Sequence, residues 1–112
     1  MQITGLDKDD VSYTDKIYNT IEESLSPMSK VTELQPMGMY VEKHKKLGKK
    51  TKYSVRIKLP TQIGVFVVTH AHGWNLITVV QEAMNNLERE FWKKYEKAYG
   101  KKRDEKRLLR GK

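Results

Sequence analysis

The C-terminal third of the chain carries an apolar stripe with the spacing of an α-helix, and this stripe limits the possible folds more than any other feature. Its residues follow at steps of three and four: Ile77, Val80, Met84, Leu87 and Phe91. Asn75 is a natural N-cap, and Gly100 is the expected end. A helix of roughly 24 residues would be about 36 Å long at ~1.5 Å per residue, which is longer than a small sheet requires. We therefore expect one face of this helix to cover a core and its far end to project beyond that core.

A second helix is predicted near the start of the chain. Ile17, Ile21 and Leu25 recur every four residues, which indicates an amphipathic helix with one apolar face. Thr14 can serve as its N-cap, and Pro27 is expected to end it. This helix also needs a surface to cover.

Four strands are predicted, at residues 1–6, 34–43, 53–59 and 65–70. In the third, apolar and polar residues alternate cleanly, which is the pattern of a strand with one buried face. In the fourth, apolar residues fall on both faces. We therefore expect the fourth strand in the interior of the sheet.

The order of the predicted elements is strand, helix, three strands, helix. A helix between the first two strands makes a crossover unit, whereas the later strands can be joined as hairpins. Because each helix has only one apolar face, both are expected side by side on one face of a four-stranded sheet. The predicted fold class is an α/β (α+β) two-layer sandwich. Residues 1–100 are expected to form its single domain, and residues 101–112, which hold little apolar surface, a basic disordered tail.

Length and composition indicate one soluble globular domain. The chain has 112 residues, of which 38% are hydrophobic and 32% charged. No run approaches the ~18 to 20 apolar residues of a membrane span, and the start, MQITGLDKDD, has neither the basic flank nor the apolar stretch of a secretory signal. The chain has no cysteine, which excludes disulfides, thiolate nucleophiles and cysteine-based metal sites. We expect a cytoplasmic protein.

The net charge of +8 is unevenly distributed along the chain. Residues 1–26 hold six acidic and two basic residues, a net charge of −4. Residues 42–58 hold eight basic residues and one acidic residue, and residues 89–112 hold eleven basic and four acidic residues, so each block carries +7. Two cationic blocks favour a polyanion as the partner. The competing interpretation is a lysine-rich surface that only keeps the protein soluble.

Nucleic acid is the polyanion that these blocks favour, because clustered lysine and arginine gain affinity from counterion release at any phosphate backbone. On the last helix, Arg89, Lys93 and Lys97 are predicted to form a ridge opposite the apolar stripe. The alternative for this helix is a solvated face crossed by pairs of opposite charge. The residues predicted to bind RNA are Lys45, Lys46, Lys49, Lys50, Arg56, Lys58, Arg89, Lys93, Lys97, Lys101, Lys102 and Arg103.

Four segments of the chain resemble the family of hibernation-promoting factors and ribosome-associated inhibitors, also called protein Y. The segments are MQITG, TDKIYNTIEESL, VRIKLP and NLITVVQEAMNNLERE. Asn75 stands where the family usually has an N-cap aspartate, and Leu87, Glu88 and Arg89 match its Leu-Glu-Arg. The resemblance covers residues 1 to about 97. It rests on the joint order and spacing of the segments.

This resemblance implies a translation inhibitor that binds the rRNA of the small ribosomal subunit. Members of the family occupy the mRNA channel near the decoding and peptidyl-tRNA sites and idle the ribosome. Short members end after the final helix with a tail, and this chain is similar to the short form. Members often carry basic residues on the first helix, whereas here Asp15, Glu22 and Glu23 leave only Lys16. The first helix therefore departs from the family's pattern.

Catalysis and metal binding have little support in the sequence. His70 and His72 would share one side of a strand, but His44 lies in the lysine-rich segment and no third ligand stands near the pair. We predict that the chain is not an enzyme, needs no cofactor or metal, takes no small-molecule substrate, contacts no membrane and is a monomer. Of the aromatic residues, Trp92 is expected to pack against the rim of the sheet or the first helix rather than stack on RNA, and Trp74 to fix its loop onto the core.

Two other function classes remain open. One is a general RNA-binding or small ribosomal protein similar to a double-stranded RNA-binding domain, although such a domain has lysines at the start of its last helix, where this chain has GWNLITVV. The other is a protein-interaction module whose acidic first helix docks a basic partner. Binding at high salt in the absence of RNA would favour this second class.

Overall fold

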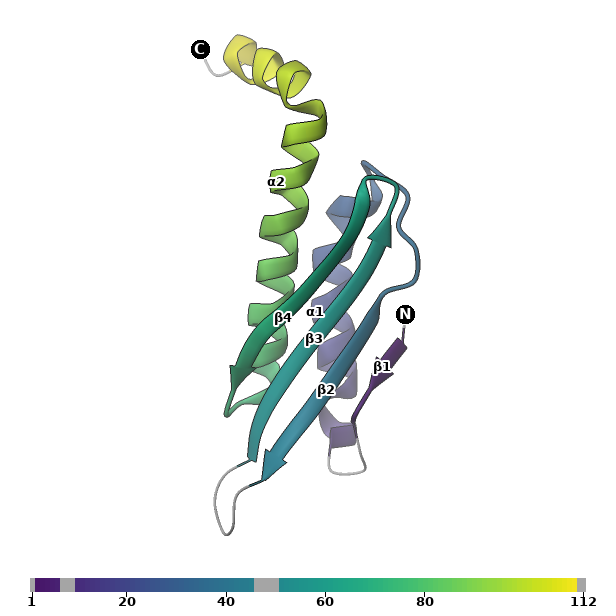
Figure 1. Ribbon diagram of the computed structural model, residues 1–112, viewed down its shortest axis with the longest axis vertical. Coiled ribbons are helices and arrows are strands. Elements are labelled where there is room, and N and C mark those ends of the chain that lie inside the picture. The colour runs from purple at the N-terminus through teal and green to yellow at the C-terminus, as the bar shows by residue number, and fades with distance from the viewer. Residues whose placement is uncertain (1, 7–9, 46–50, 111–112) are drawn as a thin grey trace.

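The fold is a two-layer sandwich, seen in a computed structural model that describes residues 2–6, 10–45 and 51–110 (Figure 1). Its elements are β1 (Gln2–Thr4), α1 (Val11–Ser29), β2 (Gly38–Lys45), β3 (Thr51–Thr61), β4 (Gly64–Gly73) and α2 (Leu76–Arg110). The strands form one four-stranded sheet in the order β1-β2-β3-β4. β1 pairs with β2 in parallel through the α1 crossover, and the other pairs are antiparallel. The predicted order of elements and fold class are confirmed.

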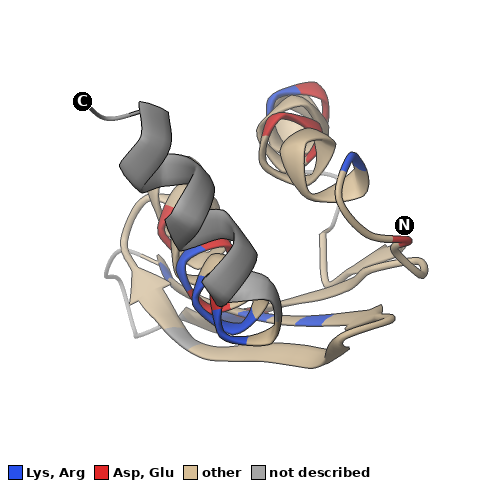
Figure 2. Ribbon diagram, turned by 90° about the horizontal axis from the view of Figure 1, so that it is seen from above, with Lys and Arg blue, Asp and Glu red and all other residues tan. Residues whose placement is uncertain are grey.

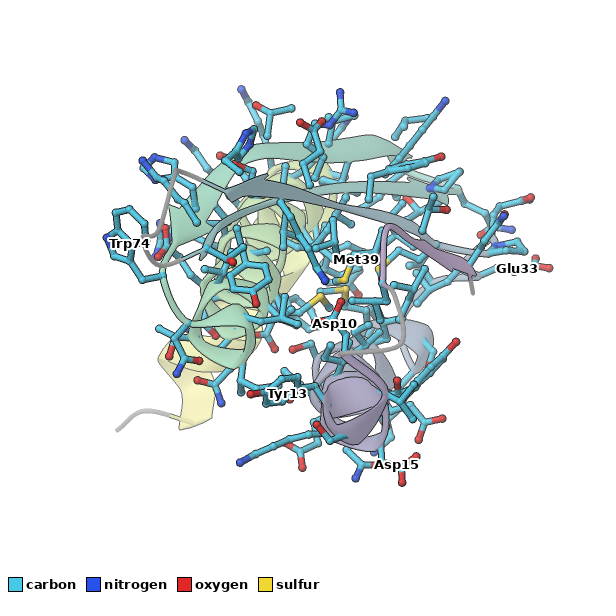
Figure 3. All side chains as sticks on the ribbon, turned by 90° about the horizontal axis from the view of Figure 1, so that it is seen from below. Asp10, Tyr13, Asp15, Glu33, Met39 and Trp74 are labelled. Carbon is cyan, nitrogen blue, oxygen red and sulfur yellow. The ribbon has the colours of Figure 1, made fainter. Side chains whose placement is uncertain are left out.

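Both helices cover the same face of the sheet and leave the other face open (Figure 2). The inward residues of β2 and β3 follow the alternation of the sequence, so Met39, Val55 and Leu59 are fully buried. Figure 3 shows Met39 between the sheet and the helices. Phe66 of β4 meets Phe91 of α2 with ring centres 5.4 Å apart. The core therefore lies in a single layer between the sheet and the two helices.

α1 begins and ends at different residues from those predicted. Its N-cap is Asp10 rather than Thr14, which lies within the first turn and donates its hydroxyl to the Asp10 carbonyl at 3.5 Å. Pro27 lies inside the helix, which continues to Ser29. Proline removes only one backbone donor. Because Pro27 lies close to the end of the helix, the last carbonyls accept hydrogen bonds from N–H groups beyond it. The N–H groups of Lys30 and Thr32 donate to Pro27 and Met28 at 3.3 and 3.1 Å.

β4 is an edge strand, so the prediction that it lies in the interior of the sheet is wrong. Val65 and Val67, its second set of apolar residues, are 54% and 58% exposed. They lie on the face of the sheet that no helix covers. An apolar residue on each face of a strand is thus no sign that both faces are buried.

α2 passes through Gly100 and reaches Arg110, so the predicted end at Gly100 is also wrong. One glycine inside a helix costs about 1 kcal/mol relative to alanine, and the lysine, arginine, glutamate and leucine residues that follow are strong helix formers. The C-terminal turns extend beyond the end of the sheet, as predicted (Figure 1). The division into a domain up to residue 100 and a disordered tail stays a prediction.

A buried ion pair fixes the start of α1 to the sheet. Lys43 points inward from β2, and its Nζ lies 2.5 Å from Oδ2 of Asp10. The side chains are 14% and 2% exposed. Figure 3 shows Asp10 between α1 and the sheet. Lys43 therefore belongs to the basic block at residues 42–58 but stabilises the fold.

Asp10→Asn is expected to lower the free energy of unfolding by about 1 to 3 kcal/mol, because it leaves the ammonium of Lys43 without its carboxylate. This is less than the ~3 to 5 kcal/mol of a fully buried pair, since Lys43 keeps some contact with water. Urea unfolding followed by circular dichroism measures the loss. Asp15→Asn is the control, an exposed acid on the same helix, and should change stability by less than ~0.5 kcal/mol. Equal losses in the two variants would contradict the structural role of the pair.

Candidate nucleic-acid interface

The rotation of α2 decides which of its charged residues reach solvent. Asn75 accepts a hydrogen bond from the N–H of Thr78 on Oδ1 at 3.0 Å, so the predicted N-cap is confirmed. Val80, Met84, Leu87 and Phe91 are at most 1% exposed, as the stripe predicts. Ile77 is only partly buried, and its place in the core is taken by Leu76 and Val79. The cations of α2 lie on the remaining sides.

Two of the predicted RNA-binding residues, Lys93 and Lys97, lie beside β4 rather than opposite the core. They line a hollow of about 390 Å³ between α2 and the edge of the sheet. Lys97 stands only ~80° around the helix from Leu87 at ~100° per residue, so its long side chain borders the core and ends in water. The hollow is lined by Val65, Phe66, Val67, Glu90, Lys93, Lys94 and Lys97.

Lys94 belongs to the same surface and was missed from the sequence. Its Nζ lies 5.6 Å from the ring centre of Phe66, a cation–π contact that holds the ammonium at the edge of β4. It also occupies the space above Gly64, where a side chain would collide with it. Gly64 has a φ of 135°, which other residues rarely adopt. The spacing of three residues from Phe91 was the signal that Lys94 lies near the core.

Arg89 lies apart from this group. It is exposed, does not line the hollow, and donates from Nη1 to Oδ1 of Asn86 at 3.3 Å. It stands about one turn before Lys93 on the solvent side of α2. The predicted ridge is therefore divided, with Lys93 and Lys97 at the sheet edge and Arg89 facing away from the sheet.

Arg56 and Lys58 lie on the open face of the sheet, opposite the layer that contains α2. Both are exposed on β3. Nη2 of Arg56 pairs with Oε1 of Glu42 at 3.1 Å, and its Cζ lies 5.9 Å from the ring centre of Tyr40. The structure thus brings Arg56 and Lys58 together on a second surface, whose hollow shares Val67 with the hollow that Lys93 and Lys97 line.

The remaining predicted residues lie at the limits of the described chain. Lys46, Lys49 and Lys50 fall outside the described residues. Lys45 ends β2, and Lys101, Lys102 and Arg103 belong to α2, but these four side chains are also outside the described part. Their role in RNA binding stays a prediction.

The side of α2 that faces α1 is acidic and polar. Glu88 lines a groove between the helices together with Glu23, and burial raises its pKa above the ordinary value. Asp15 and Glu22 of α1 are exposed, and Figure 2 shows the acidic residues of α1 on the helix away from the sheet edge of α2. Charge is therefore separated across the helical layer, with cations at β4 and carboxylates at α1.

The two tryptophans differ in their surroundings. Trp92 is half-buried and packs edge-on against Phe91 of the same helix, with ring centres 4.9 Å apart. Trp74 was expected to hold its loop onto the core, but it is 53% exposed and points away from the core (Figure 3). Nζ of Lys52 lies 5.9 Å from its ring centre. Trp74 is thus an aromatic residue at the protein surface with the ammonium of Lys52 near its ring.

Residues 2–6, 10–45 and 51–110 contain no candidate metal site and no helix that could span a membrane. Within these ranges, no group of three or more histidine, cysteine, aspartate or glutamate residues is placed to hold a metal ion. Neither described helix combines the length and the apolar content needed to cross a membrane. The side chain of His70 lies outside the described part, and Nε2 of His44 lies 3.3 Å from Oγ of Ser54.

Comparison with known proteins identifies the family. No curated protein matches the chain. The family model for the hibernation factor Hib, C-terminal domain, matches residues 1–111, which is nearly the whole chain. The resemblance to ribosome hibernation-promoting factors is confirmed by this match. The chain belongs to the hibernation factor family, as a Hib C-terminal domain.

Proposed function

We propose that this hibernation-factor domain binds the rRNA of the small ribosomal subunit in the mRNA channel, near the decoding and peptidyl-tRNA sites, and thereby blocks translation. It acts in the cytoplasm by occupying a site and not by catalysis. The observation that carries the proposal is the hollow between α2 and β4, which three lysines line, in a chain that belongs to the hibernation factor family.

The arrangement of the hollow suits a phosphate backbone. Lys93, Lys94 and Lys97 surround it, and Glu90 is the one acid among its lining residues. Lysine acts as a point charge toward phosphate and needs no fixed direction, so three lysines on a rigid helix can follow a curved backbone. The contact with the Phe66 ring holds the Lys94 ammonium at the sheet edge before binding, which lowers the entropy cost of its contact with a phosphate. We propose that Arg89 and the cations of the β2–β3 loop and of residues 101–103 extend this contact.

The test is sedimentation and translation with the purified chain. Added at modest excess, the chain should move with the small subunit in a sucrose gradient and reduce protein synthesis in a cell-free system. The antibody-detected protein should also shift from free fractions to ribosomal fractions when growing cells are starved. A chain that stays at the top of the gradient and leaves translation unchanged would refute the proposal.

Removing two lysines of the hollow should weaken binding in a way that a matched variant does not. In Lys93→Gln/Lys97→Gln the slope of log affinity against log salt should become shallower by about 1.8, at ~0.9 per duplex phosphate contact. The control is Lys16→Gln/Lys30→Gln, which removes the same charge from exposed positions on α1 and at its C-cap. Filter binding to small subunits at several salt concentrations measures both slopes. The same slope change in the two variants would show that net charge, and not this surface, controls binding.

A further inference from the structure

The open face of the sheet carries an exposed aromatic residue that the phosphate contacts of α2 do not use. Tyr40 on β2 is 44% exposed, and the helices cover the opposite face (Figure 2). Gly38, two residues earlier on the same face, leaves room for the ring, because a Cβ there would lie 3.2 Å from the hydroxyl oxygen of Tyr40. The ring is thus supported by the strand and open to solvent.

Two shallow hollows meet at Tyr40 and Lys58. One has a volume of about 510 Å³ and also includes Gln2, Pro36 and Pro60. The other, of about 260 Å³, extends toward β4. The residues that complete the second hollow are Arg56, Ile57, Val67 and Thr69. Tyr40 and Lys58 therefore border both hollows and separate them. A flat group can lie in either hollow.

Positive charge borders the ring. Cζ of Arg56 is 5.9 Å from the centre of the Tyr40 ring, and Nη2 of Arg56 pairs with Oε1 of Glu42 at 3.1 Å. The pairing of β3 with β4 changes register between Val55 and Ile57, where two residues of β4 lie opposite Arg56. Lys58 is exposed beside it.

We propose that this outer face binds unpaired bases of single-stranded RNA, with one base stacked on Tyr40 and the flanking phosphates held by Arg56 and Lys58. Every base offers a π-face, so stacking on an aromatic side chain beside arginine or lysine binds RNA without a required sequence. This inference rests on the proposed RNA-binding function but concerns a different surface from Lys93 and Lys97.

A protein partner fits this face less well. Val65 and Val67 are exposed nearby and would suit an apolar contact. However, Lys58 borders both hollows, and lysine is depleted in the core of protein interfaces. A single RNA strand whose bases face the sheet and whose phosphates lie outside would contact both the Tyr40 ring and the cations.

The experiment measures fluorescence anisotropy of a labelled oligoadenylate and of an abasic ribose-phosphate strand of the same length. The chain should bind oligoadenylate more tightly than the abasic strand. Tyr40→Leu should raise the Kd for oligoadenylate by roughly 5- to 150-fold per stacked base, leave the Kd for the abasic strand unchanged, and keep the salt slope. Tyr40→Phe should keep most of the affinity. Lys93→Gln/Lys97→Gln should instead weaken binding to both strands and reduce the salt slope.

Tyr13→Ala is the matched control, because Tyr13 on α1 is 42% exposed, close to the value of Tyr40 (Figure 3). It should leave binding to both strands unchanged. The stacking inference is wrong if the Tyr40→Leu variant has the same Kd for oligoadenylate as the unaltered chain. It is also wrong if the substitution raises the Kd for the two strands equally. It is also wrong if Tyr40→Leu weakens binding to intact small subunits only, which would indicate a ribosomal protein on this face. The proposed function fails separately, through loss of sedimentation with the small subunit by the unaltered chain.

Discussion

Raising the salt concentration from 50 to 200 mM is expected to weaken binding to the small ribosomal subunit by roughly 10³- to 10⁵-fold, for ~6 to 10 phosphate contacts. The cause is counterion release, since each phosphate neutralised by a lysine or arginine frees ions into the solution. The hollow at α2 supplies Lys93, Lys94 and Lys97. We propose that Arg89 and the other predicted cations supply the remaining contacts. Sedimentation or filter binding over a series of salt concentrations measures the slope.

A flat salt response would support the alternative of a protein-interaction module. In that case the exposed carboxylates of α1, Asp15 and Glu22, would be the first surface to test. Their replacement by asparagine and glutamine should then weaken binding. If rRNA phosphates are the partner, the same replacement should leave binding unchanged or strengthen it slightly, because it removes negative charge near a polyanion.

The fold was predictable because its long elements have clear periods. The stripe of α2 extends from Val80 to Phe91 without a break, and the alternation of β3 places Val55, Ile57 and Leu59 on one face. Both patterns report on one face of one element, which is the information that a sequence carries directly. Boundaries such as Pro27 and Gly100 were less predictable, since one unfavourable residue is outweighed by the helix around it.

The position of β4 could not be derived from its own residues. An apolar residue on its second face suits an interior strand covered on both sides, and it equally suits an edge strand with an open outer face. The difference depends on where the helices lie, and both lie on one side. Val65 and Val67 are exposed for this reason and not through any feature of the strand itself.

Two of the three lysines that line the hollow could be named from the sequence, but the surface that they form could not be derived. Counting charges finds Lys93 and Lys97, and the alternation of β3 places Arg56 and Lys58 away from the core. The sequence does not show that the first pair borders β4, because that depends on how α2 packs across the sheet. Lys94 was missed for the same reason. A lysine three residues after a core phenylalanine becomes part of the site only when a strand edge lies beside it.

Leu87→Ala is expected to lower the free energy of unfolding by about 2 to 5 kcal/mol, the usual cost of a cavity in a packed core. Leu87 is fully buried at the centre of the α2 stripe, where the helix meets the sheet. At roughly 4 °C per kcal/mol for a domain of this size, the melting temperature should fall by about 8 to 20 °C. Thermal unfolding followed by circular dichroism measures the shift.

Two control variants show whether the rotation of α2 is correct. Val11→Ala removes the same kind of group from a position that is 68% exposed and should cost less than ~0.5 kcal/mol. Lys93→Gln/Lys97→Gln should likewise leave the melting temperature nearly unchanged while it reduces the salt slope of binding. Leu87→Ala should do the reverse at temperatures where it remains folded, because the lysines at the edge of β4 are untouched. Equal melting losses in the leucine and lysine variants would mean that α2 presents a different face to the sheet, and that the cationic hollow is not the surface described.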